Sequence, residues 1–301
     1  MTRKHAPLHG IRILSLALNL PGPAALMRCR RMGAACTKLE PPGGDPMGHY
    51  NPTAYAQLHE GVNILQANLK TQEGQDLVHG ELAHADVLLT SFRPSALEKL
   101  GLGWPQLRSR YPALSQVAIV GAPGARAEEP GHDLTYLAEN GLVPGLELPA
   151  TLYADMGGSL MAAEAVLQAA LRKHERHGDG GDPHPEGLYL EVALSDAAGY
   201  LALPRQWGLT QANGSVGGAH AGYRVYPCKD GRVAVAALEP HFAAALCAAA
   251  GVAASDVKTM FAPGTHQAVA AFFSARTRTQ LDQLAVEKDL PLYTLEPAPG
   301  P

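Results

Sequence analysis

The fold is decided by residues 11–39, IRILSLALNLPGPAALMRCRRMGAACTKL. An apolar run over Ile11–Leu18 ends at a Pro-Gly-Pro turn, helix-patterned residues follow, and a second apolar run covers Cys36–Leu39. Two apolar runs separated by a helical stretch are typical of a parallel βαβ unit. The turn lies where backbone N–H groups often meet a ligand, although an ordinary strand-to-helix loop explains the same residues equally well.

The same alternation continues along the chain. Further apolar, β-branched runs cover Asp86–Thr90 and Gln116–Val120, with helix-patterned residues between them. Thr71 is a competent N-cap for a helix that we expect to reach about Leu82. Residues 156–176 form the longest helix candidate, and their cationic end suits a helix C-terminus. The pattern therefore predicts an α/β fold with a parallel sheet.

The composition changes over residues 177–187, HGDGGDPHPEG, where glycine and proline predict a loop or linker. His174, His177 and His184 lie in or beside this stretch. We favour a solvated loop over a metal site because no rigid frame holds the imidazoles.

The residues beyond this loop predict a second group of elements. Residues 188–203 predict a strand and a helix, and residues 223–238 predict a β-hairpin that turns at Lys229–Gly231, with the glycine supplying a positive φ. No GxGxxG follows the first strand and no GxxxxGK[ST] occurs. The sequence therefore predicts neither a dinucleotide site nor a P-loop.

Composition limits the classes of partner. The 301 residues carry a net charge of -4, so we expect no nucleic-acid partner and no attraction to an anionic membrane. The first apolar run is interrupted by Ser15 and Asn19, which favours a buried strand over a signal peptide, and no apolar span of about 20 residues suggests a membrane helix. The four cysteines form no CxxC pair, which favours buried free thiols in a cytoplasmic protein.

Six ordered blocks of the chain resemble CoA-transferase family III, the CaiB/BaiF-like group, and are most similar to its α-methylacyl-CoA racemase branch. They include an opening strand and Pro-Gly-Pro turn, a Glu-Pro-Pro-Gly-Gly-Asp segment, a Phe-Arg-Pro signature and a Gly-His-Asp motif. The blocks cover residues 10–47, 67–74, 85–121, 130–141, 153–171 and 223–242.

The resemblance implies an architecture. We expect a Rossmann-like large α/β domain over residues 1–186, a linker over 187–221 and a small α+β domain over 222–301. Two subunits would form an interlocked homodimer, with the active site between the large domain of one chain and the small domain of the other. The family also implies an acyl-CoA substrate, with no metal and no cofactor beyond coenzyme A as part of that substrate.

The resemblance also implies catalytic roles. A racemase removes a proton from the carbon beside the thioester carbonyl and returns one to the opposite face, which requires two acid/base groups. His132 and Asp155 match that pair, and Glu239 would orient His132, in trans in the dimer. Gly157 and Gly158, at the expected helix N-terminus, would let backbone N–H groups reach the thioester oxygen.

Ordinary structural roles explain the same residues. Asp133 is well placed to cap a short helix over residues 134–139, closed by Asn140 and Gly141. His132 alone is typical of a hydrogen-bonded structural histidine, and Asp155 of a helix N-cap. Glu239 before a proline is common at a helix entry.

For the CoA moiety, the resemblance indicates Arg93 and Lys70 as partners for phosphate oxygens. Exposed positions on helices explain both residues equally well. The neighbours of Lys70 in its motif, Ala67, Asn68 and Leu69, and the pocket residues Gly131 and Tyr136 complete the expected binding set.

The chain departs from the family pattern in its basic residues. Glu60, Val62 and Asn63 stand where relatives carry a basic loop, and Pro41 replaces an arginine after the second strand. Three arginines in the first helix, at positions 28, 30 and 31, are candidates to compensate. The chain also ends earlier than typical members, which predicts a fold trimmed at that edge.

Two alternatives to the racemase stay open. In a CoA-transferase, Asp155 attacks the acyl thioester and carries covalent intermediates. In a catalytically silent paralogue, the chain binds acyl-CoA or serves only as structure, which the missing basic residues favour.

Overall fold

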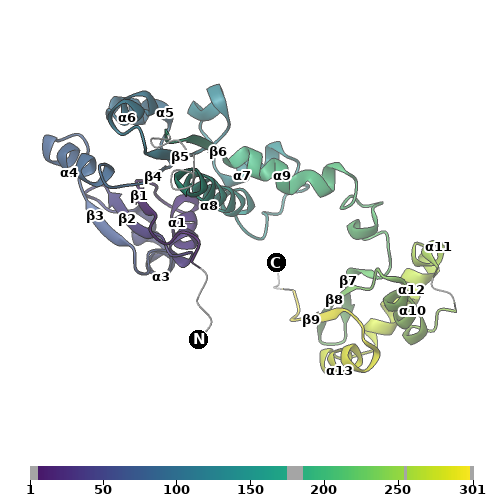
Figure 1. Ribbon diagram of the computed structural model, residues 1–301. Helices are drawn as coiled ribbons and strands as arrows, with labels where there is room; N and C mark the ends of the chain where they lie inside the picture. The colour runs from purple at the N-terminus through teal and green to yellow at the C-terminus, as the bar shows by residue number, and fades with distance from the viewer. Residues whose placement is uncertain (1–5, 175–185, 254–255, 299–301) are drawn as a thin grey trace. The chain divides into compact units, whose positions relative to one another are not determined.

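The computed structural model describes residues 6–174, 186–253 and 256–298 (Figure 1). The chain divides into two compact units, one running to Ala202 and the other beginning at Leu203. Most of the glycine-rich stretch over residues 177–187, including His177 and His184, lies outside the described residues.

The first unit is built on a six-stranded parallel sheet of order β3-β2-β1-β4-β5-β6. Its strands are β1 (Arg12–Ser15), β2 (Ala35–Glu40), β3 (Asn63–Gln66), β4 (Val87–Thr90), β5 (Ser115–Val120) and β6 (Tyr189–Ala193). The predicted α/β fold with a parallel sheet is confirmed. Strand β3 escaped prediction because its four residues, NILQ, contain only two apolar side chains.

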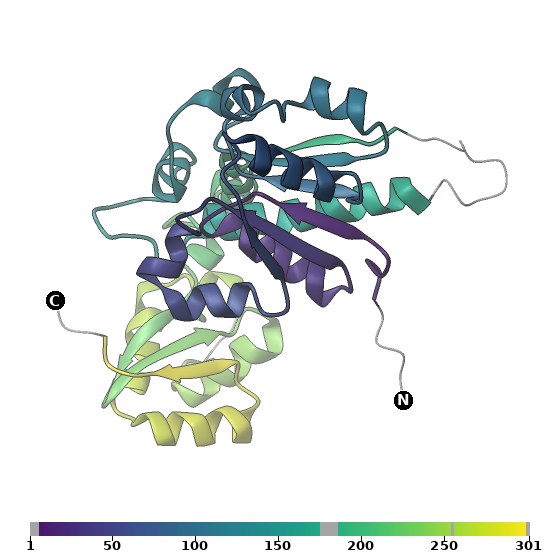
Figure 2. The same cartoon turned by 90° about the vertical axis from the view of Figure 1, so that its left-hand side faces the viewer.

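Helices cover both faces of this sheet, as Figures 1 and 2 show. Ile13 of β1 packs in one apolar cluster with helices α1 and α8, while its neighbour Leu14 packs in a second cluster with α4, α5 and α6. Successive strand side chains point to opposite faces, so a strand covered on both sides buries neighbouring apolar side chains in two different clusters. The helices of the first unit are α1 (Pro21–Arg31), α2 (Pro46–Tyr50), α3 (Pro52–Leu58), α4 (Gln72–Leu82), α5 (Pro94–Lys99), α6 (Trp104–Arg110), η1 (Gly124–Glu128), α7 (Asp133–Glu139) and α8 (Tyr153–His174).

The boundary between the units lies in α9 (Leu194–Gln206). The stretch expected to be a linker, residues 187–221, contains both α9 and the edge strand β6, which pairs with β5. The strand and helix predicted over residues 188–203 are thus confirmed.

The second unit has a three-stranded antiparallel sheet of order β7-β8-β9, packed with helices around its own apolar core. Its elements are η3 (Ser215–Gly217), β7 (Tyr223–Cys228), β8 (Gly231–Ala236), α10 (Pro240–Ala249), α11 (Val257–Met260), α12 (Pro263–Ser274), α13 (Arg278–Lys288) and β9 (Leu292–Leu295).

The predicted hairpin is confirmed, but the role given to its glycine is wrong. Gly231 does not have a positive φ. A Cβ added at Gly231 would lie 2.3 Å from the carbonyl oxygen of Leu295 in β9. The glycine therefore permits close approach of the neighbouring strand and not an unusual turn conformation.

Among the helices of the described residues, none is long and apolar enough to cross a membrane. Cys29, Cys36 and Cys247 are buried free thiols, as predicted, and Cys228 is a half-buried one.

Candidate active site

A cavity of about 410 Å³ opens at the carboxyl ends of β1, β4 and β5. Its wall includes the segments that follow β1 (residues 18–21) and β4 (residues 91–93). The chain places β2 and β3 on one side of β1 and β4 on the other, so the strand order reverses between β1 and β4. Ligands of open parallel sheets bind at such a switch point. The turn after β1 thus lies where a ligand is expected.

Five of the residues predicted from sequence line this one cavity: Arg93, Gly131, His132, Tyr136 and Asp155. They come from the start of α5, the approach to α7, α7 itself and the first turn of α8. The fold therefore brings together side chains that are up to about 60 residues apart in sequence.

His132 is the N-cap of α7, and its backbone N–H donates to Thr135 Oγ1 over 3.0 Å. This bond satisfies one N–H at the start of the helix and fixes the backbone that carries the imidazole. Asn140 and Gly141 close the helix as predicted, with Gly141 at φ 71°.

Asp133 does cap a helix, but the prediction that it caps α7 is wrong. Its buried carboxylate accepts the backbone N–H of Asp155 over 2.9 Å, so it satisfies an N–H in the first turn of α8 and does not cap α7. Asp133 and His132 are adjacent in sequence, and this bond therefore ties the segment of His132 to the helix that carries Asp155.

Asp155 is not the N-cap of α8, because the helix begins at Tyr153. Burial in the cavity wall, and next the Asp133 carboxylate, raise the pKa of Asp155 to about 6, while His132 acts in the opposite direction. A carboxyl group with a pKa near neutrality can both take and return a proton, which suits general acid/base chemistry.

The roles predicted for Gly157 and Gly158 are wrong. Both lie beyond the first turn of α8, where backbone N–H groups bond within the helix. A Cβ at Gly158 would lie 2.3 Å from Leu194 Cδ2, and one at Gly157 would lie 3.2 Å from Leu201 Cδ1. The Gly-Gly pair therefore allows α9 to pack closely against α8.

The start of α5 holds Arg93 at the cavity. Arg93 is the N-cap residue of this helix and its side chain is exposed. The next turn is anchored by Glu128, whose carboxylate accepts from the N–H and the Oγ of Ser95 over 2.7 and 2.8 Å. These bonds lower the pKa of Glu128. Arg93 is thus a cation on an anchored segment beside His132 and Asp155.

Residues Ala67 to Lys70 do not line this cavity. They follow β3 at the edge of the sheet, two strands away from β1. Asn68 Oδ1 accepts the backbone N–H of Lys70 over 3.1 Å, and the Lys70 side chain is exposed. Its predicted contact with CoA phosphates stays a prediction.

Glu239 lies in the second unit, where it is the exposed N-cap residue of α10 and makes no side-chain cap hydrogen bond. The helix-entry position predicted for it is confirmed. Its action on His132 stays a prediction.

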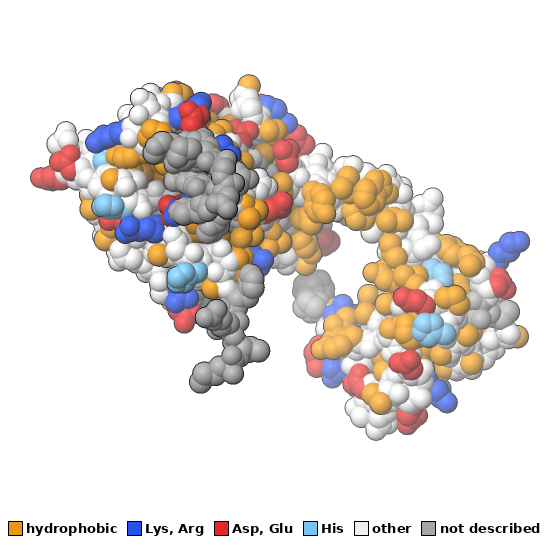
Figure 3. All heavy atoms as spheres, viewed as in Figure 1, with side chains coloured by type: hydrophobic (Ala, Val, Ile, Leu, Met, Phe, Trp, Pro, Cys, Tyr) orange, Lys and Arg blue, Asp and Glu red, His pale blue; other side chains and the backbone are white. Residues whose placement is uncertain are grey.

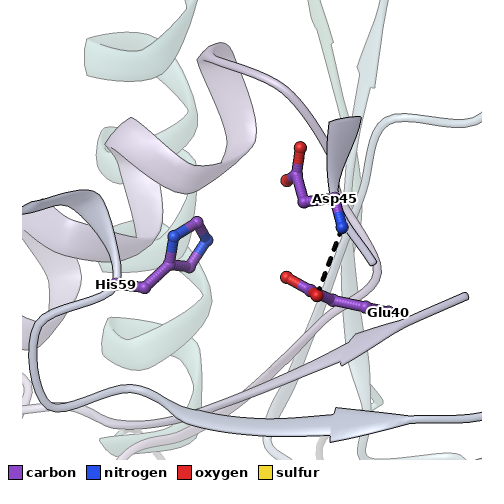
Figure 4. A group of neighbouring side chains, drawn as sticks. All are labelled: Glu40, Asp45 and His59. Carbon is purple, nitrogen blue, oxygen red and sulfur yellow. Dashed lines mark hydrogen bonds between the residues drawn. The ribbon is translucent and has the colours of Figure 1, made fainter. Parts of the chain in front are cut away.

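Sequence reasoning missed a second group of charged residues, which is buried beneath the cavity wall. Glu40, Asp45 and His59 turn their polar atoms toward one another (Figure 4), with ligand atoms within 4.8 Å. The centre of the group is the fully buried ammonium of Lys38, 2.5 Å from Asp45, 2.8 Å from His59 Nε2 and 3.1 Å from Glu40. The ammonium of Lys38 is thus the cation that these three possible metal ligands surround. The signal in the sequence was Lys38 inside an apolar strand, where lysine is rarely buried unpaired.

Comparisons with known proteins identify the family of the chain. The family model of CoA-transferase family III matches residues 8–298. The chain is 31% identical to the succinyl-CoA–D-citramalate CoA-transferase of Chloroflexus aurantiacus, over 67% of its own length and 52% of that relative. It is 26% identical to the alpha-methylacyl-CoA racemase of Mus musculus, over 97% of its own length and 79% of the racemase. The chain thus spans about half the length of the first of these relatives.

Solved structures are similar across nearly the whole chain. The crystal structure of a hypothetical protein from Mycobacterium tuberculosis covers 96% of this chain, and the chain covers 84% of that protein, at a TM-score of 0.80 and 25% identity. A CaiB/BaiF family protein from Brucella suis covers 98%, with a TM-score of 0.76 and 22% identity, which shows the shared fold.

Proposed function

The chain belongs to CoA-transferase family III, and from this premise we propose that it is an enzyme that racemises 2-methylacyl-CoA thioesters by moving a proton between two faces of one carbon. The observation that supports this proposal most is the meeting of His132 and Asp155 at one cavity, with the pKa of Asp155 raised to about 6. A general acid/base works best when its pKa lies near the operating pH.

In the proposed reaction, one of the two side chains takes the α-proton and the other delivers a proton to the opposite face. The electron pair of the broken C–H bond moves into the thioester carbonyl, which forms an enolate, and it returns to carbon when the second proton arrives. The N-terminus of α8 carries a partial positive charge beside Asp155 and stabilises negative charge formed there.

Coenzyme A enters only as part of the substrate in this proposal. Arg93 is the cation at the cavity and is assigned to a CoA phosphate oxygen, while Lys70 is assigned to the outer part of the ligand. Loss of a charge-assisted hydrogen bond from Arg93→Ala should weaken acetyl-CoA binding by about tenfold or more in calorimetry. Equal affinity in the variant would remove Arg93 from the binding set.

A CoA-transferase is the second candidate. Named relatives such as the C. aurantiacus enzyme and the succinyl-CoA:glutarate CoA-transferase of Homo sapiens are transferases. In that reaction the ionised Asp155 attacks the thioester carbonyl, the CoA thiolate leaves, and an acyl-aspartyl anhydride forms. The CoA thiolate then attacks the aspartyl carbonyl of the anhydride, the acyl group leaves as a carboxylate, and CoA stays bound to Asp155 as a thioester. Above its pKa of about 6, Asp155 carries the charge that such a nucleophile needs.

One experiment separates these candidates. The full chain is incubated with a 2-methylacyl-CoA in deuterated water, and the α-proton is followed by NMR while intact mass reports adducts. Racemisation predicts exchange of the α-proton without an adduct. A CoA adduct on Asp155 with no deuterium in the substrate would support the transferase, and neither signal, with acetyl-CoA still bound, would support a silent paralogue.

We also propose that the protein is a homodimer in which Glu239 orients His132 across the interface. Exposed apolar side chains on α8 and α9, including Leu160, Tyr200 and Leu201, support a partner surface, and Figure 3 shows hydrophobic side chains along the segment of α9. Light scattering should return twice the chain mass. A monomer at all micromolar concentrations would exclude the role of Glu239 in trans.

A further inference from the structure

The wall of the cavity contains a residue in an unusual backbone conformation. Asn19, which follows β1, has φ 64° and lines the cavity. A non-glycine residue at positive φ is uncommon, and asparagine tolerates this left-handed region better than most. The surrounding structure must hold such a residue in place.

The group that holds Asn19 lies outside the cavity. The backbone N–H of Asn19 donates to both carboxylate oxygens of Asp45, each over 3.1 Å. Asp45 is only 2% exposed and is not part of the cavity lining. The backbone N–H of Asn19 is therefore occupied by the protein, and its direction is fixed from behind the wall.

Asp45 also fixes a second segment of the same wall. It is the N-cap of α2, where Oδ1 accepts the backbone N–H of Met47 over 2.9 Å. That helix ends at Tyr50, which lines the cavity. One buried carboxylate thus connects the turn after β1 with the helix that carries Tyr50.

The carboxylate of Asp45 is itself held by the buried ammonium of Lys38. The three acceptors around this ammonium come from Asp45, Glu40 and His59, which matches the three N–H bonds of a lysine. Because Lys38 must donate to His59 Nε2, the imidazole carries its proton on Nδ1, which lies 2.7 Å from the carbonyl oxygen of Tyr55. Glu40 is fixed in turn by the hydroxyl of Tyr55 over 2.9 Å.

We propose that Asp45 is a positioning residue for acyl-CoA binding: it holds Asn19 at its positive φ and keeps the turn over residues 19–21 in the conformation that binds the ligand. The buried ammonium of Lys38 keeps the carboxylate of Asp45 in place. The inference rests on the proposed function, because it assigns the cavity to an acyl-CoA. It adds a residue that contacts no substrate and acts through Asn19.

The main test is Asp45→Asn in the full chain, with acetyl-CoA as the probe. The amide keeps one oxygen, which can still cap α2, but it cannot accept from Asn19 through two oxygens. We expect the Kd of acetyl-CoA to rise about tenfold, as for loss of a hydrogen bond to a charged group. We expect kcat at saturating substrate to change less than the KM, because bound ligand reorders the turn.

The matched control is Glu40→Gln, the same acid-to-amide change on the other carboxylate of the buried group. Glu40 contacts Lys38, and its Oε2 accepts the backbone N–H of Asp45 over 3.2 Å, but it does not contact Asn19. The glutamine oxygen can still accept this N–H, so the variant should lower thermal stability and leave the Kd of acetyl-CoA unchanged. Equal loss of affinity in both variants would show that general destabilisation, and not positioning, weakens binding, and would overturn the proposal.

Substitution of Asn19 itself keeps the proposal testable if Asp45→Asn does not fold. Glycine adopts positive φ without steric cost, whereas alanine is strained there, so Asn19→Gly should bind acetyl-CoA more tightly than Asn19→Ala. In a folded Asp45→Asn background, Asn19→Gly should restore part of the lost affinity. Equal affinity of the glycine and alanine variants would overturn the proposal.

Binding of acetyl-CoA to the unaltered chain distinguishes a failure of the proposed function from a failure of the positioning role. If it binds no acetyl-CoA at millimolar concentration, the proposed function fails and the positioning role falls with it. If it binds and Asp45→Asn binds equally well, only the positioning role is overturned.

Discussion

Two groups of histidine and carboxylate side chains lie in the first unit. The buried group consists of Glu40, Asp45 and His59 around Lys38, and the cavity group consists of His132 and Asp155. The two groups differ in how their charges are paired. In the buried group, the ammonium of Lys38 has three acceptors, and both oxygens of Asp45 accept backbone N–H groups. In the cavity group, the carboxylate of Asp155 accepts no hydrogen bond from any described residue, and its pKa is raised. Buried charge is stable only when it is paired, so unpaired groups at a cavity are available to a ligand.

The largest expected effect lies in the cavity group. His132→Ala should slow α-proton exchange from one enantiomer of a 2-methylacyl-CoA by about 10²- to 10⁴-fold, because each acid/base group serves one face of the carbon. Some exchange from the other enantiomer should remain. NMR in deuterated water with each pure enantiomer measures both rates. The control is His79→Ala, a half-buried histidine bonded to Tyr111 outside the cavity, and equal slowing in both variants would contradict the assignment.

A substitution in the buried group should instead change the free energy of unfolding. Lys38→Met removes the cation and leaves Glu40 and Asp45 buried without it, which should lower the free energy of unfolding by about 3–5 kcal/mol. Urea unfolding measures the loss. Arg126→Met is the matched control, because Arg126 also lies between two carboxylates, Glu129 and Glu139, but at the surface. It should change stability little. Comparable losses in both variants would refute the distinction between the two groups.

An acid-to-amide change should have opposite signs in the two groups. The folded pKa of Asp155, about 6, lies above its ordinary value of 3.8, so the ionised form costs stability above pH 6 and costs nothing below about pH 4. Asp155→Asn should therefore raise the free energy of unfolding at pH 8 by on the order of 2 kcal/mol. Asp45→Asn should lower it. Thermal unfolding of both variants at pH 4 and pH 8 tests this, and destabilisation by Asp155→Asn at pH 8 would contradict it.

The smallest expected effect concerns His59. Burial, and next the Lys38 ammonium, lower the pKa of His59 below its ordinary value of 6.5. The unfolded chain then binds a proton that the folded chain does not, so this group's contribution to stability is present above pH 6.5 and is lost as the pH falls through the folded pKa. His59→Gln should flatten this part of the stability profile between pH 7.5 and pH 5. An unchanged profile would show that His59 does not titrate within the buried group.

Local patterns predicted most of the secondary structure. Four of the six strands in the parallel sheet were predicted from apolar runs in the first 120 residues, and Thr71 caps α4 as its residue type indicated, with its Oγ1 accepting the N–H of Gly74 over 3.2 Å. Such elements depend on periodicity and on residues three or four positions apart, which a sequence shows directly. Strand β3 was missed because pairing with β2, rather than its own short pattern, stabilises it.

The sequence by itself determined the alternation of strands and helices and, through its likeness to a family, the choice of His132, Asp155 and Arg93. Only the tertiary structure decided which groups meet. Asp133 reaches the first turn of α8, Gly158 meets Leu194, and Lys38 meets Asp45 and His59 inside the fold. The reason is physical: a hydrogen bond or a close contact depends on distance and direction in space, and residues far apart in the chain acquire these only when the strands take their order in the sheet.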